Sequence, residues 1–366
     1  MRVWAGLLIV GSWTSVARAA DDCSTPAACF ESAQKYASGH AGVKRDWKKA
    51  VALASRACDQ KEARGCNLAG ELIDHGRAGK PDRKKASGLY RKACEAGFGG
   101  GCSNWAWSLF REEGDAGQDV VETTHKALAL LEKACEGGGA EACHGAAMLL
   151  EAGPGRTSPD KRAVALFQKG CDGGHGESCF RLGLRLLRGG EPRAESARAI
   201  GLLKKACDGG VLPACIEAGI ALEKGAPGVK KDDAVSVNLL TRALSAYEKD
   251  CDGGFPEACV SLGAMYEAGQ GMLRSAKTAS GYYKNACDAG EGTGCRKLAD
   301  RYNAGEGGIE ESPRDAIRLW KRGCDLLDGE SCERASNFFG TNNAKEAARY
   351  HMRACDLDKA ICAPRP

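Results

Sequence analysis

Cysteine is the residue type of this chain with the clearest potential for chemistry. The 366 residues include 20 cysteines, and all of them stand in local pairs. Eight pairs have partners eight positions apart: Cys58/Cys66, Cys94/Cys102, Cys135/Cys143, Cys171/Cys179, Cys207/Cys215, Cys251/Cys259, Cys287/Cys295 and Cys324/Cys332. Two shorter pairs lie towards the ends, Cys23/Cys29 and Cys355/Cys362. Thiols paired in this way either form disulfides or bind metal.

The spacing favours disulfides over a metal site. Structural zinc sites usually place cysteines two to four residues apart, often with paired histidines. No pair here has that spacing, and the six histidines are scattered along the chain. Disulfides are the expected state of cysteines in an exported protein. We therefore predict ten disulfides, each within its own pair, and no metal or other cofactor.

The cysteine pairs also mark a repeat. The first cysteines of successive pairs lie 36, 41, 36, 36, 44, 36 and 37 residues apart from Cys58 to Cys324, and periods of this size are typical of helical arrays. After Cys259, apolar residues recur at helical spacing, and a second helical segment follows the break at Gly269-Gln270-Gly271. Each unit therefore reads helix, glycine-rich loop, helix, tight turn, and the predicted fold class is all-α.

The tight turn has its own signature. An acidic residue follows the first cysteine of every eight-position pair, as in Asp208 and Asp252, and a glycine pair often comes next, as in Gly209-Gly210. Glycine at this point predicts a helix end in the left-handed conformation. We expect the acidic side chain to accept hydrogen bonds from the first N–H groups of the next helix.

Two intervals exceed the common period, by five residues after Cys94 and by eight after Cys207. We expect the extra residues in loops between helices, near 111–122 and 225–235. Such loops would be either recognition loops on one rim or neutral surface insertions, and the second hypothesis is preferred.

Several aromatic residues fall at positions that should pack between helices. We expect most of them in the core, with a ligand-binding aromatic strip as the alternative. They are Trp105, Trp107, Trp320, Tyr282, Tyr283, Phe338 and Phe339.

The first residues resemble a signal peptide over positions 1–19. Arg2 supplies positive charge, Val3 to Val16 is mainly apolar, and Ala17-Arg18-Ala19 is a small-x-small cleavage site. No later stretch reaches the length of a membrane span, so we expect export to the periplasm or outside the cell. Without Arg2 and Arg18 the chain keeps 50 basic and 48 acidic residues. This balance points to neither nucleic acid nor an anionic membrane as a partner.

The unit that runs from Lys249 to Gly263, with the sequence KDCDGGFPEACVSLG, resembles Sel1-like repeats, which are relatives of the tetratricopeptide repeat. A cysteine pair in every unit is similar to the cysteine-rich secreted branch of that family, first recognised in Helicobacter. A disulfide-rich Sel1 protein of the mitochondrial intermembrane space is a more distant relative. The resemblance implies a right-handed α/α solenoid over residues 20–366. An N-terminal cap would cover about 20–45, eight cysteine-paired units about 46–340 and a C-terminal cap about 341–366.

The same resemblance implies a function. Sel1-like repeats mostly hold other proteins on a curved surface, so we expect binding of a peptide, a protein or a cell-wall fragment. The secreted branch also carries a penicillin-binding and weak β-lactamase assignment, which makes β-lactam hydrolysis the alternative.

Motifs for that hydrolysis are nearly absent. Serine β-lactamases combine S-x-x-K, S-D-N and K-T-G elements. An S-x-x-K match runs from Ser32 to Lys35, and these two residues are the weak catalytic candidates. Tyr283-Lys284-Asn285 matches the middle element only superficially, and Lys277-Thr278 is followed by alanine instead of glycine. We therefore expect no conventional catalytic site.

Overall fold

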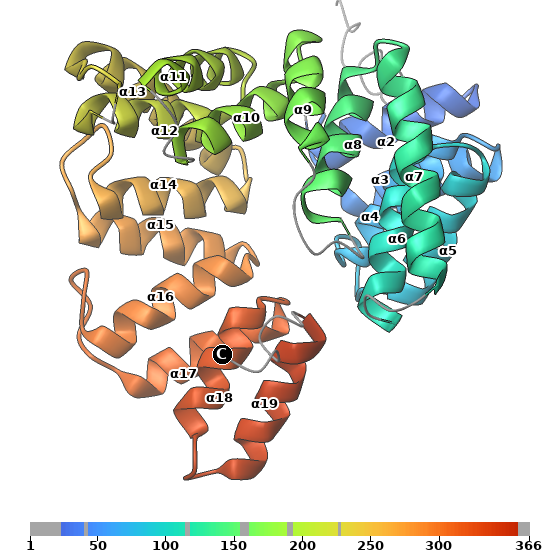
Figure 1. The fold of residues 1–366 in the computed structure, drawn as a ribbon. Coiled ribbons are helices and arrows are strands. Elements are labelled where there is room, and N and C mark those ends of the chain that lie inside the picture. The colour runs from blue at the N-terminus through green and yellow to red at the C-terminus, as the bar shows by residue number, and fades with distance from the viewer. Residues whose placement is uncertain are drawn as a thin grey trace, which may run out of the picture. The chain divides into compact units, whose positions relative to one another are not determined.

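The computed structural model describes residues 23–39, 43–113, 118–153, 161–188, 193–225 and 228–357. The predicted signal peptide at 1–19 and the predicted partner cysteine Cys362 lie outside these ranges. All regular secondary structure in the described ranges is helical, labelled α2 to α19 (Figure 1). The prediction of an all-α fold is confirmed.

The chain divides into two compact units, at Ser178 and Cys179. The first unit holds α2 (Pro26–Ser38), α3 (Trp47–Asp59), α4 (Ala63–Asp74), α5 (Arg83–Glu95), α6 (Gly99–Glu113), α7 (Gln118–Glu136), α8 (Ala140–Ala152) and α9 (Arg162–Asp172). Helix α10 (Gly176–Arg188) crosses the division. The second unit continues with α11 (Arg193–Asp208), α12 (Leu212–Lys224), α13 (Asp233–Asp252), α14 (Pro256–Ala268), α15 (Ala276–Asp288), α16 (Gly292–Ala304), α17 (Pro313–Asp325), α18 (Gly329–Phe339) and α19 (Ala344–Leu357).

Within each unit the helices pack in chain order. From α2 to α9, and again from α11 to α19, every helix packs on the next one. Contacts also join α2 to α4, α4 to α6 and α6 to α8 in the first unit, and α14 to α16 and α16 to α18 in the second. The helices that follow a disulfide turn therefore lie side by side and form a common surface.

Short polar side chains start several of the helices that precede a disulfide. The Asp46 side chain accepts a hydrogen bond from Lys49 N at 3.0 Å, and Asp82 accepts from Lys85 N at 2.9 Å. Both satisfy N–H groups that have no partner inside the helix. The loops before α3 and α5 end at these caps, which fixes where the two helices begin.

The eight-position disulfides join the ends of neighbouring helices, as expected from the cysteine pairs, and Cys23–Cys29 ties the residues before α2 to that helix. The structure contains Cys23–Cys29, Cys58–Cys66, Cys94–Cys102, Cys135–Cys143, Cys207–Cys215, Cys251–Cys259, Cys287–Cys295 and Cys324–Cys332. Cys171, Cys179 and Cys355 are also disulfide-bonded. Among the described residues no cysteine is free.

Each disulfide requires two helix backbones to come close together. In the eight-position pairs described above, the two Cα atoms lie 4.3–4.8 Å apart. Small residues next to the cysteines make this approach possible. A Cβ added to Gly65 would lie 2.6 Å from the Cβ of Ala57, and one added to Gly294 would lie 2.6 Å from that of Ala286.

The tight turn uses a left-handed residue three positions after the first cysteine. This position is glycine in six turns: Gly97, Gly138, Gly174, Gly210, Gly254 and Gly290, with φ between 85° and 92°. Lys61 and Leu327 occupy it in the other two turns, with φ of 68° and 70°. The prediction of a left-handed glycine at the helix end is therefore correct for most units.

The prediction for the acidic residue in this turn is wrong. Asp208 accepts a hydrogen bond from Arg242 at 2.7 Å, and Asp288 accepts from Lys284 at 2.6 Å and from Arg322 at 3.3 Å. These carboxylates lie in the last turn of their own helix and face solvent, so they pair with basic side chains of the same or the next repeat. Other groups take the N-cap position of the following helix, such as Val211 and Glu291.

The extra residues of the two long intervals are in helices, which corrects the expectation that they form loops. Helices α7 and α13 have 19 and 20 residues, whereas α5 and α15 have 13 each. The connection before α13 is eight residues long, and so is the connection before α5.

Side-chain packing locates the insertion in α13. Leu240 packs on Gly219 although it precedes Cys251 by 11 positions, whereas the corresponding Tyr90 precedes Cys94 by four. Seven residues have therefore been added between Leu240 and Cys251. Since seven residues make about two helical turns, the apolar face keeps its direction.

The left-handed turn generates a first testable prediction. Gly210→Ala should lower the free energy of unfolding by about 1 kcal/mol, because a Cβ is unfavourable in the left-handed region. Gly201→Ala is the matched control. Gly201 lies exposed within α11, and a Cβ added there would meet nothing within 4 Å, so this change should raise stability by up to about 1 kcal/mol. Urea unfolding of the oxidised protein measures both, and equal effects of the two changes would contradict the assignment.

Candidate functional site

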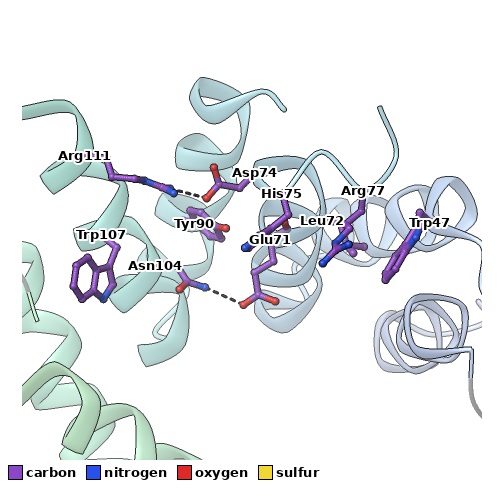
Figure 2. Close-up of a pocket in the computed structure, with 10 residues that line it drawn as sticks. All are labelled: Trp47, Glu71, Leu72, Asp74, His75, Arg77, Tyr90, Asn104, Trp107 and Arg111. Atoms are coloured by element: carbon purple, nitrogen blue, oxygen red, sulfur yellow. Dashed lines mark hydrogen bonds and ion pairs between the residues drawn. The ribbon is translucent and has the colours of Figure 1, made fainter. Parts of the chain in front are cut away.

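A cavity of about 470 Å³ opens on the first unit where α4 and α6 lie side by side (Figure 2). Four helices and one turn supply its walls. The lining residues are Trp47, Glu71, Leu72, Asp74, His75, Arg77, Tyr90, Asn104, Trp107 and Arg111.

Asp74, the last residue of α4, is the most unusual group in this cavity. Its side chain is only 6% exposed. Oδ2 accepts a hydrogen bond from Arg111 Nη2 at 2.6 Å, but Oδ1 is buried without a hydrogen-bond partner. A buried carboxylate oxygen without a donor is costly. The Tyr90 hydroxyl is the hydrogen-bond donor within reach of this carboxylate.

Tyr90 lies beside Asp74 and is 2% exposed. Burial raises the pKa of the Tyr90 hydroxyl, and the carboxylates of Asp74 and Glu71 raise it further. The hydroxyl thus stays protonated at neutral pH. Its ring packs on α4, where a Cβ at Gly70 would lie 2.7 Å from Cε1 of Tyr90.

Glu71 accepts hydrogen bonds from two side-chain amides, one on its own helix α4 and one on α6. Its Oε1 accepts from Asn67 Nδ2 at 2.8 Å and from Asn104 Nδ2 at 3.0 Å. Asn104 also donates to Asn67 Oδ1 at 2.9 Å. This network joins α4 to α6 and fixes a second carboxylate on the cavity wall.

Two tryptophans lie at opposite ends of the cavity (Figure 2). The guanidinium carbons of Arg45 and Arg77 lie 4.8 Å and 5.4 Å from the ring centroid of Trp47. Trp107, near Asp74 and Asn104, is 36% exposed. It contacts Phe110 edge to face, with ring centroids 5.8 Å apart. The Trp47 end therefore already has cationic neighbours, whereas the Trp107 end presents aromatic surface to solvent.

The second unit contains a related cluster at equivalent repeat positions. Glu267 follows Cys259 by eight positions, as Asp74 follows Cys66. The Tyr283 hydroxyl donates to Glu267 Oε2 at 2.5 Å, and Arg301 Nη2 pairs with Oε1 at 2.5 Å. Both oxygens of this carboxylate therefore have partners, in contrast to Asp74.

The sequence candidates for catalysis lie elsewhere. Ser32 is 1% exposed within α2, and neither it nor Lys35 lines the cavity. Lys284, in the superficial middle motif, binds Asp288 on the surface of α15 at 2.6 Å. No group of three or more His, Cys, Asp or Glu side chains suited to a metal ion occurs in the described residues.

A serine between two histidines was not identified from the sequence. Ser178 Oγ lies 3.2 Å from Nδ1 of His144 and 3.1 Å from Nδ1 of His175. Ser178 is fully buried and packs against Gly170. A substrate cannot reach this hydroxyl, so the cluster serves helix packing.

The aromatic residues divide between core and surface. Tyr283 and Trp320 are buried, as expected for core packing, and Trp105 packs against the cluster around Tyr90. Trp107 and Phe338 are 36% and 41% exposed. The expectation of core packing therefore fails for these last two.

The repeat architecture matches a known family. The Sel1 repeat model matches eight segments: residues 26–62, 63–98, 104–139, 140–175, 176–211, 212–246, 256–291 and 293–326. The chain belongs to the Sel1 repeat family. The cavity falls within the second and third of these Sel1 repeats, apart from Trp47 in the first.

Similarity to individual proteins is lower. Cytochrome c oxidase assembly factor 7 of Xenopus tropicalis is 30% identical over 139 residues, which cover 37% of this chain and 58% of that protein. A Sel1 repeat protein from Oxalobacter formigenes is 20% identical, with a TM-score of 0.43 and coverage of 89% and 90% of the two chains. The protein c5321, a protective antigen of uropathogenic Escherichia coli with an SLR fold, is 20% identical, with a TM-score of 0.37. The match covers 92% of this chain and 76% of that chain.

The satisfied cluster of the second unit generates a pH prediction. Burial would raise the pKa of Glu267, but the hydrogen bond from Tyr283 and the charge of Arg301 lower it overall. Stability from this carboxylate is therefore complete above the unfolded pKa of about 4.3 and is lost as pH falls through the lower folded value. Glu267→Gln should cost about 1.5–3 kcal/mol at pH 7 and less at pH 3.

Urea unfolding at both pH values measures this difference. Glu306→Gln is the control, since Glu306 is 61% exposed and is the second partner of Arg301, at 2.7 Å. It should have a small effect at either pH. A cost for Glu267→Gln that does not change with pH would count against the assigned charge state.

Proposed function

We propose that this protein is an exported, disulfide-stapled Sel1 scaffold that binds a peptide or protein segment across α4 and α6. Sel1 repeats typically mediate protein interactions. The observation that carries the proposal is the cavity itself, because it combines exposed aromatic surface at Trp107 with the fixed carboxylate of Glu71 on its wall. Binding sites combine apolar walls with a few convergent polar groups in this way.

Export is supported by the state of the cysteines. All of the described cysteines are disulfide-bonded, and such bonds persist in oxidising compartments. The apolar segment before Ala17-Arg18-Ala19 provides the export signal in this proposal. Among the described residues, no helix is long and apolar enough to cross a membrane. We infer that the protein works in the periplasm or outside the cell.

A role in assembly fits the same scaffold. The Xenopus relative is named as an assembly factor, and this chain spans 58% of its length. A partner held across several repeats would be bound without chemical change. A cell-wall fragment is the other ligand suggested by the sequence, and β-lactam hydrolysis gains no support from the described residues because Ser32 is buried.

Selection from a random peptide display library tests the binding proposal. The oxidised protein should enrich related sequences. Trp107→Ala should weaken their binding at least about tenfold, because aromatic anchors in a pocket dominate such contacts. Val237→Ala, which changes a 56% exposed apolar residue of the second unit, should bind normally. Failure to converge on related sequences, or equal binding by the Trp107→Ala protein, would refute a peptide site at this cavity.

A chromogenic β-lactam tests the alternative. The oxidised protein should give no turnover above the uncatalysed rate, because the Ser32 hydroxyl is inaccessible. Saturable turnover that disappears on reduction of the disulfides would instead establish a hydrolytic site. Ser32→Ala then shows whether this serine is involved.

A further inference from the structure

The turn that leads into α10 has a histidine where the corresponding turn of the second unit has an aspartate. His175 directly precedes α10, and Asp328 is the N-cap residue of α18. Both helices begin with the sequence Gly-Glu-Ser-Cys, in which the serine is Ser178 or Ser331. Each of these serines is fully buried and packs on a glycine of the preceding helix. The two turns are therefore the same structure with different caps.

Asp328 holds its helix through two hydrogen bonds from Ser331. The backbone N–H donates to Oδ2 at 2.8 Å, and the hydroxyl donates to the same oxygen at 2.5 Å. A carboxylate at this position satisfies an N–H group that has no partner inside the helix.

Nδ1 of His175 takes the place of this carboxylate in the first unit. Ser178 N donates to Nδ1 at 3.2 Å and also to the His175 carbonyl oxygen at 3.1 Å, and Ser178 Oγ lies 3.1 Å from Nδ1. An imidazole nitrogen accepts hydrogen bonds only when it carries no proton. The ring of His175 is therefore neutral in this arrangement, with its proton on Nε2.

A second histidine completes the cluster. Nδ1 of His144, on α8, lies 3.2 Å from Ser178 Oγ. A hydroxyl has one proton to donate, and in this arrangement it goes to His175, as the Ser331 proton goes to Asp328. Nδ1 of His144 must then donate to Oγ, so the two histidines have opposite tautomers. Their ring centroids are 4.6 Å apart.

The two clusters differ in how they respond to pH. His144 follows Cys143 as Arg296 follows Cys295, and Arg296 Nε donates to Asp328 Oδ2 at 3.1 Å. The second unit thus pairs a cation with an anion, whereas the first unit pairs two neutral imidazoles. Histidine is the side chain that ordinarily gains a proton between about pH 8 and pH 5.

We propose that His175 and His144 make the start of α10 pH-sensitive, so that acidification releases the cap that neutral His175 provides. A proton on Nδ1 of His175 removes the acceptor for Ser178. It also places a positive charge at a helix N-terminus, where the helix dipole disfavours cations. A proton on His144 as well would bring two like charges together. The affected helix is the one at which the first unit ends.

Other charged side chains on the three elements around His175 modulate this response. They are Glu141 on α8, Lys169 and Asp172 on α9, and Glu177 and Arg181 on α10. All except Glu177 are exposed, so solvent and salt screen their effect on the imidazole. Asp172 also accepts a hydrogen bond from Gln168 at 2.8 Å. Glu177 favours the imidazolium, but it cannot restore the acceptor that Ser178 loses.

NMR of the full oxidised protein tests the starting arrangement. Side-chain ¹⁵N shifts at about pH 8 should show the proton of His175 on Nε2 and that of His144 on Nδ1. Circular dichroism at each pH confirms that the protein is folded.

Hydrogen exchange tests the release, with Ser331 as the internal reference. One proton can change an equilibrium by at most tenfold per pH unit. Between about pH 8 and pH 5, we expect the protection factor of the Ser178 amide, corrected for intrinsic exchange, to fall at least about tenfold relative to that of Ser331. The Ser331 amide should keep its protection, because carboxylates do not ordinarily change charge in this range.

Two variants locate the effect. His175→Asp gives α10 the cap of α18, and it should keep the Ser178 amide protected at both pH values. A protonated His144 would then pair with the new carboxylate as Arg296 pairs with Asp328. His125→Asn is the control, since His125 is exposed on α7 of the same unit. It should leave the pH dependence of Ser178 unchanged.

Three outcomes would overturn the inference. A proton on Nδ1 of His175 at about pH 8 would exclude the histidine cap. Equal changes of protection at Ser178 and Ser331 would exclude a local effect. The same loss of Ser178 protection in the unmodified protein and in the folded His175→Asp variant would show that His175 is not the group that titrates.

Discussion

Two helices can share a disulfide between their ends only if their backbones come within a few ångströms of each other. In this chain the bonded Cα atoms of the eight-position pairs lie 4.3–4.8 Å apart. The residue before the second cysteine must then fit against the opposite helix. It is glycine in Gly65 and Gly294, where the facing residue is alanine. Where it is serine, as in Ser178 and Ser331, the facing residue is glycine. Close approach, disulfide and left-handed turn form one local device that lets short helices pair without large side chains between them.

This device explains why the architecture could be predicted from the sequence. Cysteine spacing, turn glycines and the apolar periodicity after Cys259 are all local signals, and they predict a helical repeat correctly. The predictions that failed concern neighbours distant in sequence. Asp208 pairs with Arg242, 34 residues later, and no local sequence pattern predicts that contact. The insertion in α13 was predicted to lie in a loop for a different reason. Residues added as whole helical turns leave the direction of the apolar face unchanged, so the helical pattern does not reveal them.

The candidate site was beyond prediction for a third reason. Asp74, Tyr90 and Arg111 match no motif, and each looks ordinary in its own repeat. The S-x-x-K match at Ser32 looked more promising, but a four-residue pattern carries no information about burial, and Ser32 is 1% exposed. The informative signal is a comparison of repeats, in which Ser108 stands where the second unit has Arg301. This signal is present in the sequence, but only the structure shows which carboxylate Arg301 serves.

Because the chain is built from repeats, equivalent positions of its two units can be compared directly. In the second unit a carboxylate, a tyrosine and an arginine satisfy one another and lie between successive hairpins, so the cluster stabilises the array. In the first unit the carboxylate and the tyrosine remain, serine holds the arginine position, and Arg111, three positions further along α6, pairs with Asp74 instead. Since the disulfides Cys58–Cys66 and Cys94–Cys102 hold each helix pair together, the fold can tolerate this change of partner. A stapled repeat can thus move one stabilising contact to another position of the same helix and keep its packing.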